Sequence, residues 1–303
     1  LAPICAELFG DIDSDTVDFV DNYDGSMKEP ALLPTRFPNV LVSANLGIAV
    51  GMASQICGFN LEEVCRTTIA YLENPNHDLL STLPAPDFPT GGIVVNQDDL
   101  EKIYETGQGK LRMRGKVEIE QVKGGKERHV ITEIPYTMMG ANIGKFLNDI
   151  ASLVETKKTT DIVDISNQSS KAGIRIVLEL KKGADVERLK NLLYKKTRLE
   201  DTFGVNMLAV ADGRPETLSL QKILEYHIDF QFEVTTRKYK NMLDKEQKKC
   251  EVQEGLIRAC DVIDLIIEVL RGSRSREQVK DCLVKGVTEG IRFKTEKSKK
   301  AAA

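Results

Sequence analysis

The stretch Leu33-Pro-Thr-Arg-Phe-Pro-Asn-Val-Leu-Val-Ser-Ala-Asn-Leu-Gly-Ile-Ala-Val-Gly-Met-Ala-Ser54 decides how this chain is interpreted. Its two prolines fix the backbone angle φ, and Gly47 and Gly51 let the backbone approach a neighbour closely. Ile48 lies between the two glycines and carries a stiff, β-branched side chain. The pattern predicts a small apolar loop built to press against another surface. From these residues alone, Ile48 is either a wedge or a core residue in a glycine-bounded turn.

Five further motifs accompany this stretch. They are Asp18-Phe-Val-Asp-Asn-Tyr-Asp-Gly25, Pro86-Asp-Phe-Pro-Thr-Gly-Gly92, the segment 110–115, Ile131-Thr-Glu-Ile-Pro135 and Phe203-Gly-Val-Asn-Met207. In order and spacing they resemble the A subunit of bacterial type IIA DNA topoisomerases, gyrase and topoisomerase IV, over essentially the whole chain. One departure is Cys57-Gly-Phe-Asn60, where the family commonly has Pro-Pro-His-Asn, and it leaves the shape of this loop open.

The resemblance implies a DNA-binding role for Ile48 and Gly47. In the family, the isoleucine of the Gly-Ile-Ala-Val-Gly pattern is pushed between base steps. An aliphatic wedge of this kind unstacks the bases and kinks the duplex, so that the protein holds a bent segment.

The resemblance also implies the chemistry of the intact enzyme, which attacks each DNA strand with a tyrosine, passes another duplex through the gap and reseals it. The family's tyrosine lies in an Arg-Tyr-Thr motif shortly before the segment that matches 1–8, and none of the seven tyrosines here follows an arginine. We therefore expect a fragment that begins just after the catalytic tyrosine, has no catalytic residue and is inactive alone. Magnesium and ATP are implied in the B subunit, with no cofactor in this fragment.

The implied partners are double-stranded DNA, the gyrase B or topoisomerase IV B subunit, and a second copy of the complete A subunit in a homodimer. The alternative is a non-enzymatic α+β and coiled-coil scaffold, which DNA binding would distinguish. No run of about 18 apolar residues and no signal peptide is present, which predicts a cytoplasmic protein with no membrane contact. The six cysteines and three histidines lack metal-ligand spacing, so no metal site is predicted.

Charge distribution bears on the DNA hypothesis more than the net charge of −4 does. Acidic residues gather in 11–24, and basic residues gather in 110–128 and 237–249. Lys110, Arg112, Arg114 and Lys116 alternate with Leu111, Met113 and Val117, which on one strand places four cations on one face. Cations about 6.6 Å apart suit a phosphate backbone. An ordinary solvated strand face is the alternative, because Glu118 and Glu120 continue the row with opposite charge.

The elements expected along the chain define an α+β fold. A helix over 61–73, capped by Asn60, is followed by strands over 110–120 and 129–134 around a Gly124-Gly125 turn. A helix over 141–155, strands over 161–166 and 173–180, a helix over 185–196 and an apolar segment over 204–210 complete a β-β-α-β-β-α-β order. One long helix then runs from about residue 220 to 270. With the resemblance, this implies the end of a winged-helix domain (1–33), a tower domain (34–217) and a coiled-coil arm leading to an exit gate (218–303).

Overall fold

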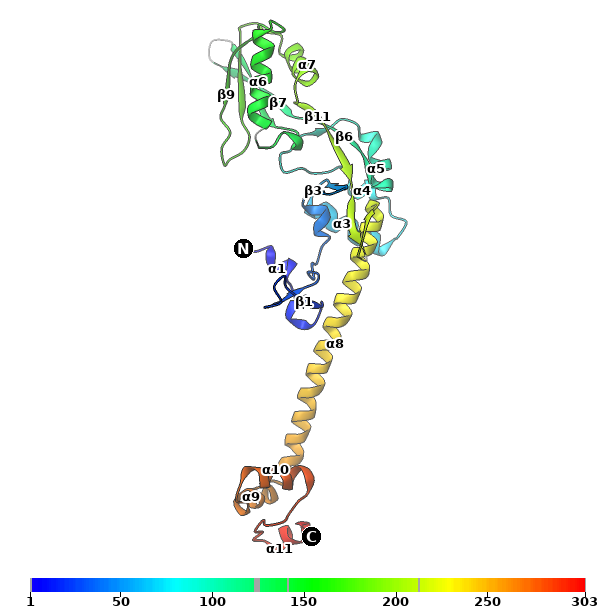
Figure 1. Cartoon of the computed structure of the whole chain (residues 1–303), viewed down its shortest axis with the longest axis vertical. Helices are drawn as coiled ribbons and strands as arrows, with labels where there is room; N and C mark the ends of the chain where they lie inside the picture. The colour runs from blue at the N-terminus through cyan, green and yellow to red at the C-terminus, as the bar shows by residue number, and fades with distance from the viewer. Residues whose placement is uncertain (1, 123–125, 141, 212, 303) are drawn as a thin grey trace. The chain divides into compact units, whose positions relative to one another are not determined.

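The computed structural model describes residues 2–122, 126–140, 142–211 and 213–302 (Figure 1). It divides into two compact units. The first contains the residues up to Gly10 together with Leu32–Glu233, and the second contains Asp11–Ala31 and the residues from Val234 onward. Antiparallel sheets and a long helix occur together, which confirms the α+β class. No helix in the described part of the chain is long and apolar enough to span a membrane.

The first unit is built on a five-stranded antiparallel sheet in the order β3-β4-β11-β6-β5. Its strands are β3 (Asn45–Ala49), β4 (Met52–Ile56), β11 (Glu200–Asn206), β6 (Gln108–Arg114) and β5 (Ile93–Val94). The sheet thus combines strands from the beginning, the middle and the end of this unit.

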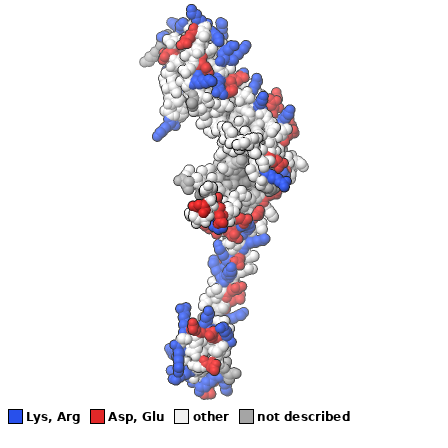
Figure 2. Space-filling model, in the orientation of Figure 1, with Lys and Arg blue, Asp and Glu red and all other residues white. Residues whose placement is uncertain are grey.

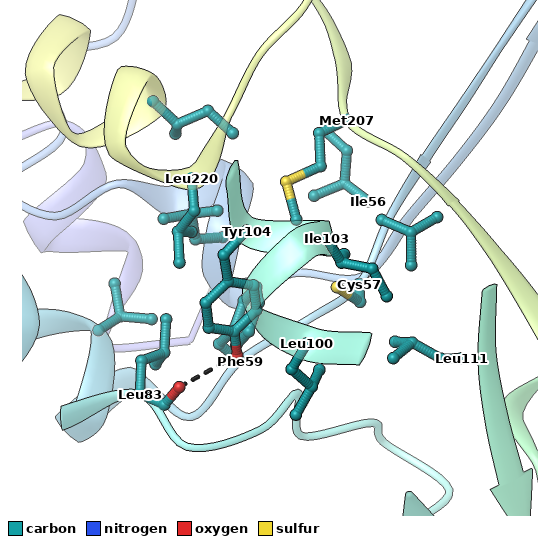
Figure 3. Close-up of a cluster of buried hydrophobic side chains, with 14 of the residues drawn as sticks. Ile56, Cys57, Phe59, Leu83, Leu100, Ile103, Tyr104, Leu111, Met207 and Leu220 are labelled. Carbon is teal, nitrogen blue, oxygen red and sulfur yellow. Dashed lines mark hydrogen bonds between the residues drawn. The ribbon is translucent and has the colours of Figure 1, made fainter. Parts of the chain in front are cut away.

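One face of this sheet is covered by helices α3 (Leu61–Glu73), α4 (Leu79–Thr82) and α5 (Leu100–Thr106). Figure 3 shows Leu111 of β6 and Ile56 of β4 in this core, with the Tyr104 hydroxyl donating to the Leu83 carbonyl oxygen at 3.0 Å. The predicted Asn60 cap of α3 is confirmed, because its side chain accepts from the amides of Glu62 and Glu63.

A second sheet of four antiparallel strands, in the order β7-β8-β10-β9, lies beyond the first along the unit (Figure 1). Its strands are β7 (Lys116–Val122), β8 (Lys126–Glu133), β10 (Ile176–Leu180) and β9 (Ile162–Asn167). Helices α6 (Asn142–Glu155) and α7 (Val186–Lys196) pack on it through Phe146, Ile150, Leu189 and Leu193. The predicted Gly124-Gly125 turn, and Ala141 at the expected start of α6, lie outside the described residues.

The prediction of one strand over 110–120 is wrong, because the chain changes sheets at Gly115. β6 pairs with β11 and β7 pairs with β8. The Gly115 amide donates to the Leu199 carbonyl at 2.8 Å, and a Cβ at Gly115 would lie 2.6 Å from the Glu133 carbonyl oxygen. Only a glycine fits between these neighbours, so the strand is interrupted where the two sheets meet.

The remaining elements of the first unit are short, apart from the start of the long helix α8 (Leu220–Asp261). The predicted apolar segment 204–210 is divided between β11 and the hairpin of β12 (Leu208–Ala211) and β13 (Arg214–Thr217). The others are α1 (Cys5–Leu8), α2 (Asn39–Val42), η2 (Gln97–Asp99) and η3 (Tyr136–Met138).

The second unit combines an acidic segment with the remainder of α8 and three shorter helices. These elements are η1 (Ile12–Ser14), β1 (Phe19–Asp21), β2 (Lys28–Pro30), α9 (Ile263–Gly272), α10 (Arg276–Lys285) and α11 (Glu296–Ala302). Arg237 pairs with Asp18 at 3.0 Å and Lys238 pairs with Asp11 at 2.8 Å. Part of the predicted basic cluster at 237–249 is therefore neutralised by the acidic segment 11–24.

The prediction of one helix continuing to about residue 270 is also wrong. α8 ends at Asp261, and α9 begins at Ile263 after Val262 leaves helical geometry. Beyond this break Val269 is buried, and a Cβ at Gly272 would lie 2.4 Å from the Arg292 carbonyl oxygen. Because of the break, one side of α9, which includes Val269, packs against the residues that follow, whereas Ile263 and Leu270 stay exposed.

Candidate nucleic-acid interface

The segment with Ile48 forms a β-hairpin of β3 and β4, with Val50 and Gly51 at its tip. Gly51 has φ of +80°, a left-handed conformation that favours glycine. Ile48 is 92% exposed and Val50 is fully exposed. The alternative in which Ile48 is a core residue is therefore wrong. An exposed apolar side chain on a projecting hairpin is the geometry that a wedge requires.

Gly51 has a backbone conformation that favours glycine, whereas Gly47 does not. Gly47 pairs with Ser54 across the hairpin, and a Cβ at Gly47 would meet only the Ser54 Cβ, at 3.7 Å. The described residues thus leave room for a side chain at this position. The packing of the described residues therefore does not explain why this position is a glycine.

The strand register places the hairpin and the predicted cations on the same face of the five-stranded sheet. Residues directly opposite each other in paired strands share a face, and every second residue along a strand does too. The connected pairs are Ile48 with Ala53, Leu46 with Gln55, Gln55 with Asn206, Gly204 with Lys110, Thr202 with Arg112 and Glu200 with Arg114. Ile48, Lys110, Arg112 and Arg114 therefore belong to one face, opposite the core.

The alternation predicted for this row is confirmed on β6. Leu111 and Met113 are buried, whereas Lys110 and Arg112 are exposed and Arg114 is half-buried. Lys116 is an exception, because it lies beyond Gly115 on β7 and belongs to the second sheet. The row of four cations on one strand is in fact three cations on β6 and a fourth across the junction of the two sheets.

Acidic partners reduce the free positive charge of this row. Arg114 and Arg112 both reach the Glu200 carboxylate, at 2.5 and 3.9 Å, and the Arg114 guanidinium lies 5.0 Å from the centre of the Tyr194 ring. Lys116 pairs with Glu118 at 3.1 Å and with Glu133 at 3.8 Å, and these carboxylates raise the pKa of Lys116. Lys110 makes no ion pair within the described residues.

Beside Lys110 lies a groove of about 700 Å³, to which Lys102 of α5 and Gln108 also contribute. The hairpin borders a second, apolar groove of about 440 Å³, lined by Ile56, Leu208 and Pro215 among others. Figure 2 shows lysine and arginine side chains interspersed with acidic ones over the visible surface. The candidate interface is a local arrangement of an apolar tip and adjacent cations, and the net charge of the chain does not reveal it.

Two residues of this face were not identified from the sequence. Glu200 neutralises the arginines, and Asn206 fastens the hairpin through a bond from its Nδ2 to the Ala53 carbonyl oxygen at 2.6 Å. Both residues lie far along the chain from the groups that they contact, so the sequence does not reveal their roles. Only the pairing of β11 with β6 and β4 brings them to the site. Within the described ranges, no three His, Cys, Asp or Glu side chains gather as a metal site.

Known proteins resemble this chain over nearly its whole length. Residues 1–301 match the family described as the A subunit of DNA gyrase/topoisomerase IV. The DNA gyrase A subunit of Clostridium acetobutylicum is 44% identical over 91% of this chain and 33% of its own length. The DNA topoisomerase 4 A subunit of Staphylococcus epidermidis is 36% identical over 94% of this chain and 36% of its own length.

These matches confirm the family that the motifs suggested, and the chain spans about a third of the length of each relative. The family match covers both units of the structure. The chain belongs to the family of DNA gyrase/topoisomerase IV A subunits.

Proposed function

We propose that this chain is the DNA-bending and DNA-supporting part of the breakage-reunion subunit of an ATP-dependent type IIA DNA topoisomerase. The observation that carries the proposal is the single sheet face that holds exposed Ile48 together with Lys110, Arg112 and Arg114. An apolar wedge and a row of cations on one rigid surface are what a protein needs to kink a duplex and hold its phosphates.

In this proposal the hairpin supplies the deformation and the strands supply the affinity. Ile48 enters between two base pairs, at a cost of a few kcal/mol for unstacking one step. Phosphate contacts by Lys110 and the two arginines offset that cost, with Lys116 continuing the contact beyond the junction of the sheets. Gly47 belongs to the opposite face of the hairpin from Ile48, and in this proposal its missing side chain lets the duplex close around the tip from that side as well.

We further propose that the domains follow the family pattern. Residues 1–33 belong to the end of a winged-helix domain, 34–217 form the tower domain, and 218–303 lead along a coiled-coil arm toward an exit gate. The exposed Leu256 and Ile257 on α8 support this assignment, because an apolar helix face of this kind suits a second helix. The expected β-β-α-β-β-α-β order gains one strand, because β6 and β7 stand where a single strand was predicted.

The rest of the reaction is assigned to other parts of the assembly. No tyrosine in these 303 residues follows an arginine, so we place the strand-cleaving tyrosine elsewhere in the complete A chain. Magnesium and ATP belong to the gyrase B or topoisomerase IV B subunit, and two A subunits form the homodimer. The magnesium ion would stabilise the oxygen displaced during strand cleavage. We place the complete assembly in the cytoplasm.

A titration of dye-labelled duplex tests the proposal. The complete A subunit with its B subunit is mixed with a duplex that carries a dye at each end, and energy transfer is recorded. We expect transfer to rise as the ends approach each other in the bent complex. The electrophoretic mobility of the duplex is measured in parallel. If neither energy transfer nor mobility changes on adding the protein, the protein does not bind this duplex, and the assembly-scaffold alternative holds.

A further inference from the structure

The hairpin that carries Ile48 has little backbone attachment to the rest of its sheet. In the described residues, β4 and β11 share a single register pair, Gln55 with Asn206. By contrast, β11 and β6 are paired along seven residues, from Glu200 with Arg114 to Asn206 with Gln108. A projecting hairpin held by so short a ladder needs other contacts if its tip is to push against a stacked duplex.

The Asn206 side chain supplies one of these contacts. Its Nδ2 donates to the Ala53 carbonyl oxygen at 2.6 Å, and Ala53 is the residue directly opposite Ile48. Its Oδ1 accepts from Gln108 Nε2 at 3.2 Å and from the Thr217 hydroxyl at 3.4 Å. The acceptor at Ala53 requires the amide nitrogen on that side, so this orientation of Asn206 satisfies all three partners.

The backbone next to Asn206 is hydrogen-bonded to other parts of the first unit. The next residue, Met207, is fully buried, and its amide donates to the Gly107 carbonyl at 2.8 Å. The amide of Leu218 donates in turn to the Met207 carbonyl at 3.0 Å. The end of β11 is thereby fixed to the end of α5 and to the residues just before α8, so a load on the hairpin is transmitted to the core.

A second clamp lies at the next residue of the hairpin. The Ser54 hydroxyl donates to the Leu208 carbonyl oxygen at 2.7 Å. Gln55 fills the space over Gly204, where a Cβ would lie 3.1 Å from the Gln55 Oε1 atom. Two neighbouring residues of β4, Ala53 and Ser54, are thus bonded to the segment 206–208.

We propose that Asn206 is a positioning residue for the wedge: by clamping the Ala53 carbonyl it holds Ile48 in a fixed direction against the resistance of the stacked bases. The inference rests on the proposed function, and it assigns to Asn206 the bond that fixes the residue opposite Ile48. Asn206 touches no DNA in this role and acts through Ala53 and Ile48.

Asn206→Asp is the variant of choice, because aspartate has the same shape and cannot donate to the Ala53 carbonyl. In the complete A subunit with its B subunit, we expect the bent fraction of a dye-labelled duplex to fall about fivefold, the effect of losing about one hydrogen bond. Amide hydrogen exchange should accelerate in residues 45–56 and stay unchanged in β6. Thr217→Val is the matched control, since it removes a bond to the acceptor side of Asn206 and should bend DNA normally.

A double-mutant cycle that combines Asn206→Asp with Ile48→Ala distinguishes a positioning role of Asn206 from a general loss of structure. If Asn206 acts through Ile48, Asn206→Asp should lower bending in the parent and have no further effect in Ile48→Ala. The inference would be overturned if Asn206→Asp bends DNA as well as the parent does. It would also be overturned if Asn206→Asp lowers bending equally in the parent and in Ile48→Ala. Asn206→Ala is the second variant, because it removes the same bond without adding a charge to this face, and it decides by the same two criteria if Asn206→Asp fails to fold. If Ile48→Ala itself bends DNA normally, the proposed function fails, whatever Asn206 does.

Discussion

Ile48 on β3 and Arg112 on β6 project from the same face of one sheet, although β4 and β11 lie between their strands. The relationship follows from the register of three strand pairs. It places an apolar tip and a cation on one surface, where a single duplex can meet both.

Replacing the wedge should impair bending more than folding. Because Ile48 is 92% exposed, Ile48→Ala leaves no core cavity, and we expect near-normal thermal stability. In the complete A subunit with its partner, bending of a labelled duplex and DNA cleavage should both be clearly reduced. A destabilised variant that still bends DNA would show that Ile48 only packs.

Ile56 on β4 is the matched control for this prediction. It is buried in the core of the first unit, so Ile56→Ala should cost about 2–5 kcal/mol of the free energy of unfolding. A drop in melting temperature for Ile56→Ala, with none for Ile48→Ala, is the expected pair of results.

Neutralising the two arginines should weaken DNA binding and its dependence on salt. For Arg112→Gln with Arg114→Gln in the complete A subunit, we expect the slope of log affinity against log salt to flatten by about one to two ions. Affinity is measured across a salt series. An unchanged slope would assign this row to the ordinary solvated surface.

Glu200 provides a test with the opposite sign. Its carboxylate binds both arginines, so Glu200→Gln should free them for phosphate and raise the affinity for duplex. The same variant combined with the two arginine changes should have little effect. Weaker binding by Glu200→Gln alone would mean that the carboxylate is needed to orient the guanidinium groups.

Stability should fall in mild acid because of His227. Burial lowers the pKa of His227 from 6.5 to about 4, although a hydrogen bond with the Arg36 backbone opposes this effect. Above pH 6.5 the imidazole is neutral in both the folded and the unfolded states. Between pH 6.5 and about 4 the unfolded chain takes up a proton that the folded chain does not, so stability decreases as the pH falls.

Thermal unfolding of the chain at pH 7.5, 6 and 5 measures this effect. His227→Gln cannot titrate, so its melting temperature should decline less over the same range. His129 contributes in the same direction, because it is fully buried and burial lowers its pKa. Parallel declines for the parent and His227→Gln would contradict the assignment to His227.

The 303-residue chain should not change DNA topology by itself. Tyr104 is buried with its hydroxyl bonded to the Leu83 carbonyl, burial raises its pKa, and no tyrosine follows an arginine. With magnesium, ATP and purified B subunit, we expect no relaxation of supercoiled plasmid on a gel. Relaxation accompanied by a covalent protein-DNA adduct would contradict the proposal that the nucleophile lies elsewhere.

Much of the local structure could be predicted from neighbouring residues. The alternation of Leu111 and Met113 with cations set the two faces of β6, and Asn60 capped α3 as expected. Such features depend on side-chain direction along one strand or on bonds within one helical turn. The single strand over 110–120 was wrong because its interruption depends on Leu199 and Glu133, which the local pattern at Gly115 does not contain.

The sequence by itself determined the α+β class and the family, and it singled out Ile48 and the basic row as candidate DNA-binding residues. Periodicity and motif spacing can be seen along the chain without knowing which distant residues meet. Only the tertiary structure decided that these residues share a face, that Glu200 neutralises the arginines and that Asn206 clamps the hairpin. The physical reason is strand register. Which residues meet across a sheet depends on how strands distant in the chain pair, and a shift by one residue would exchange the two faces.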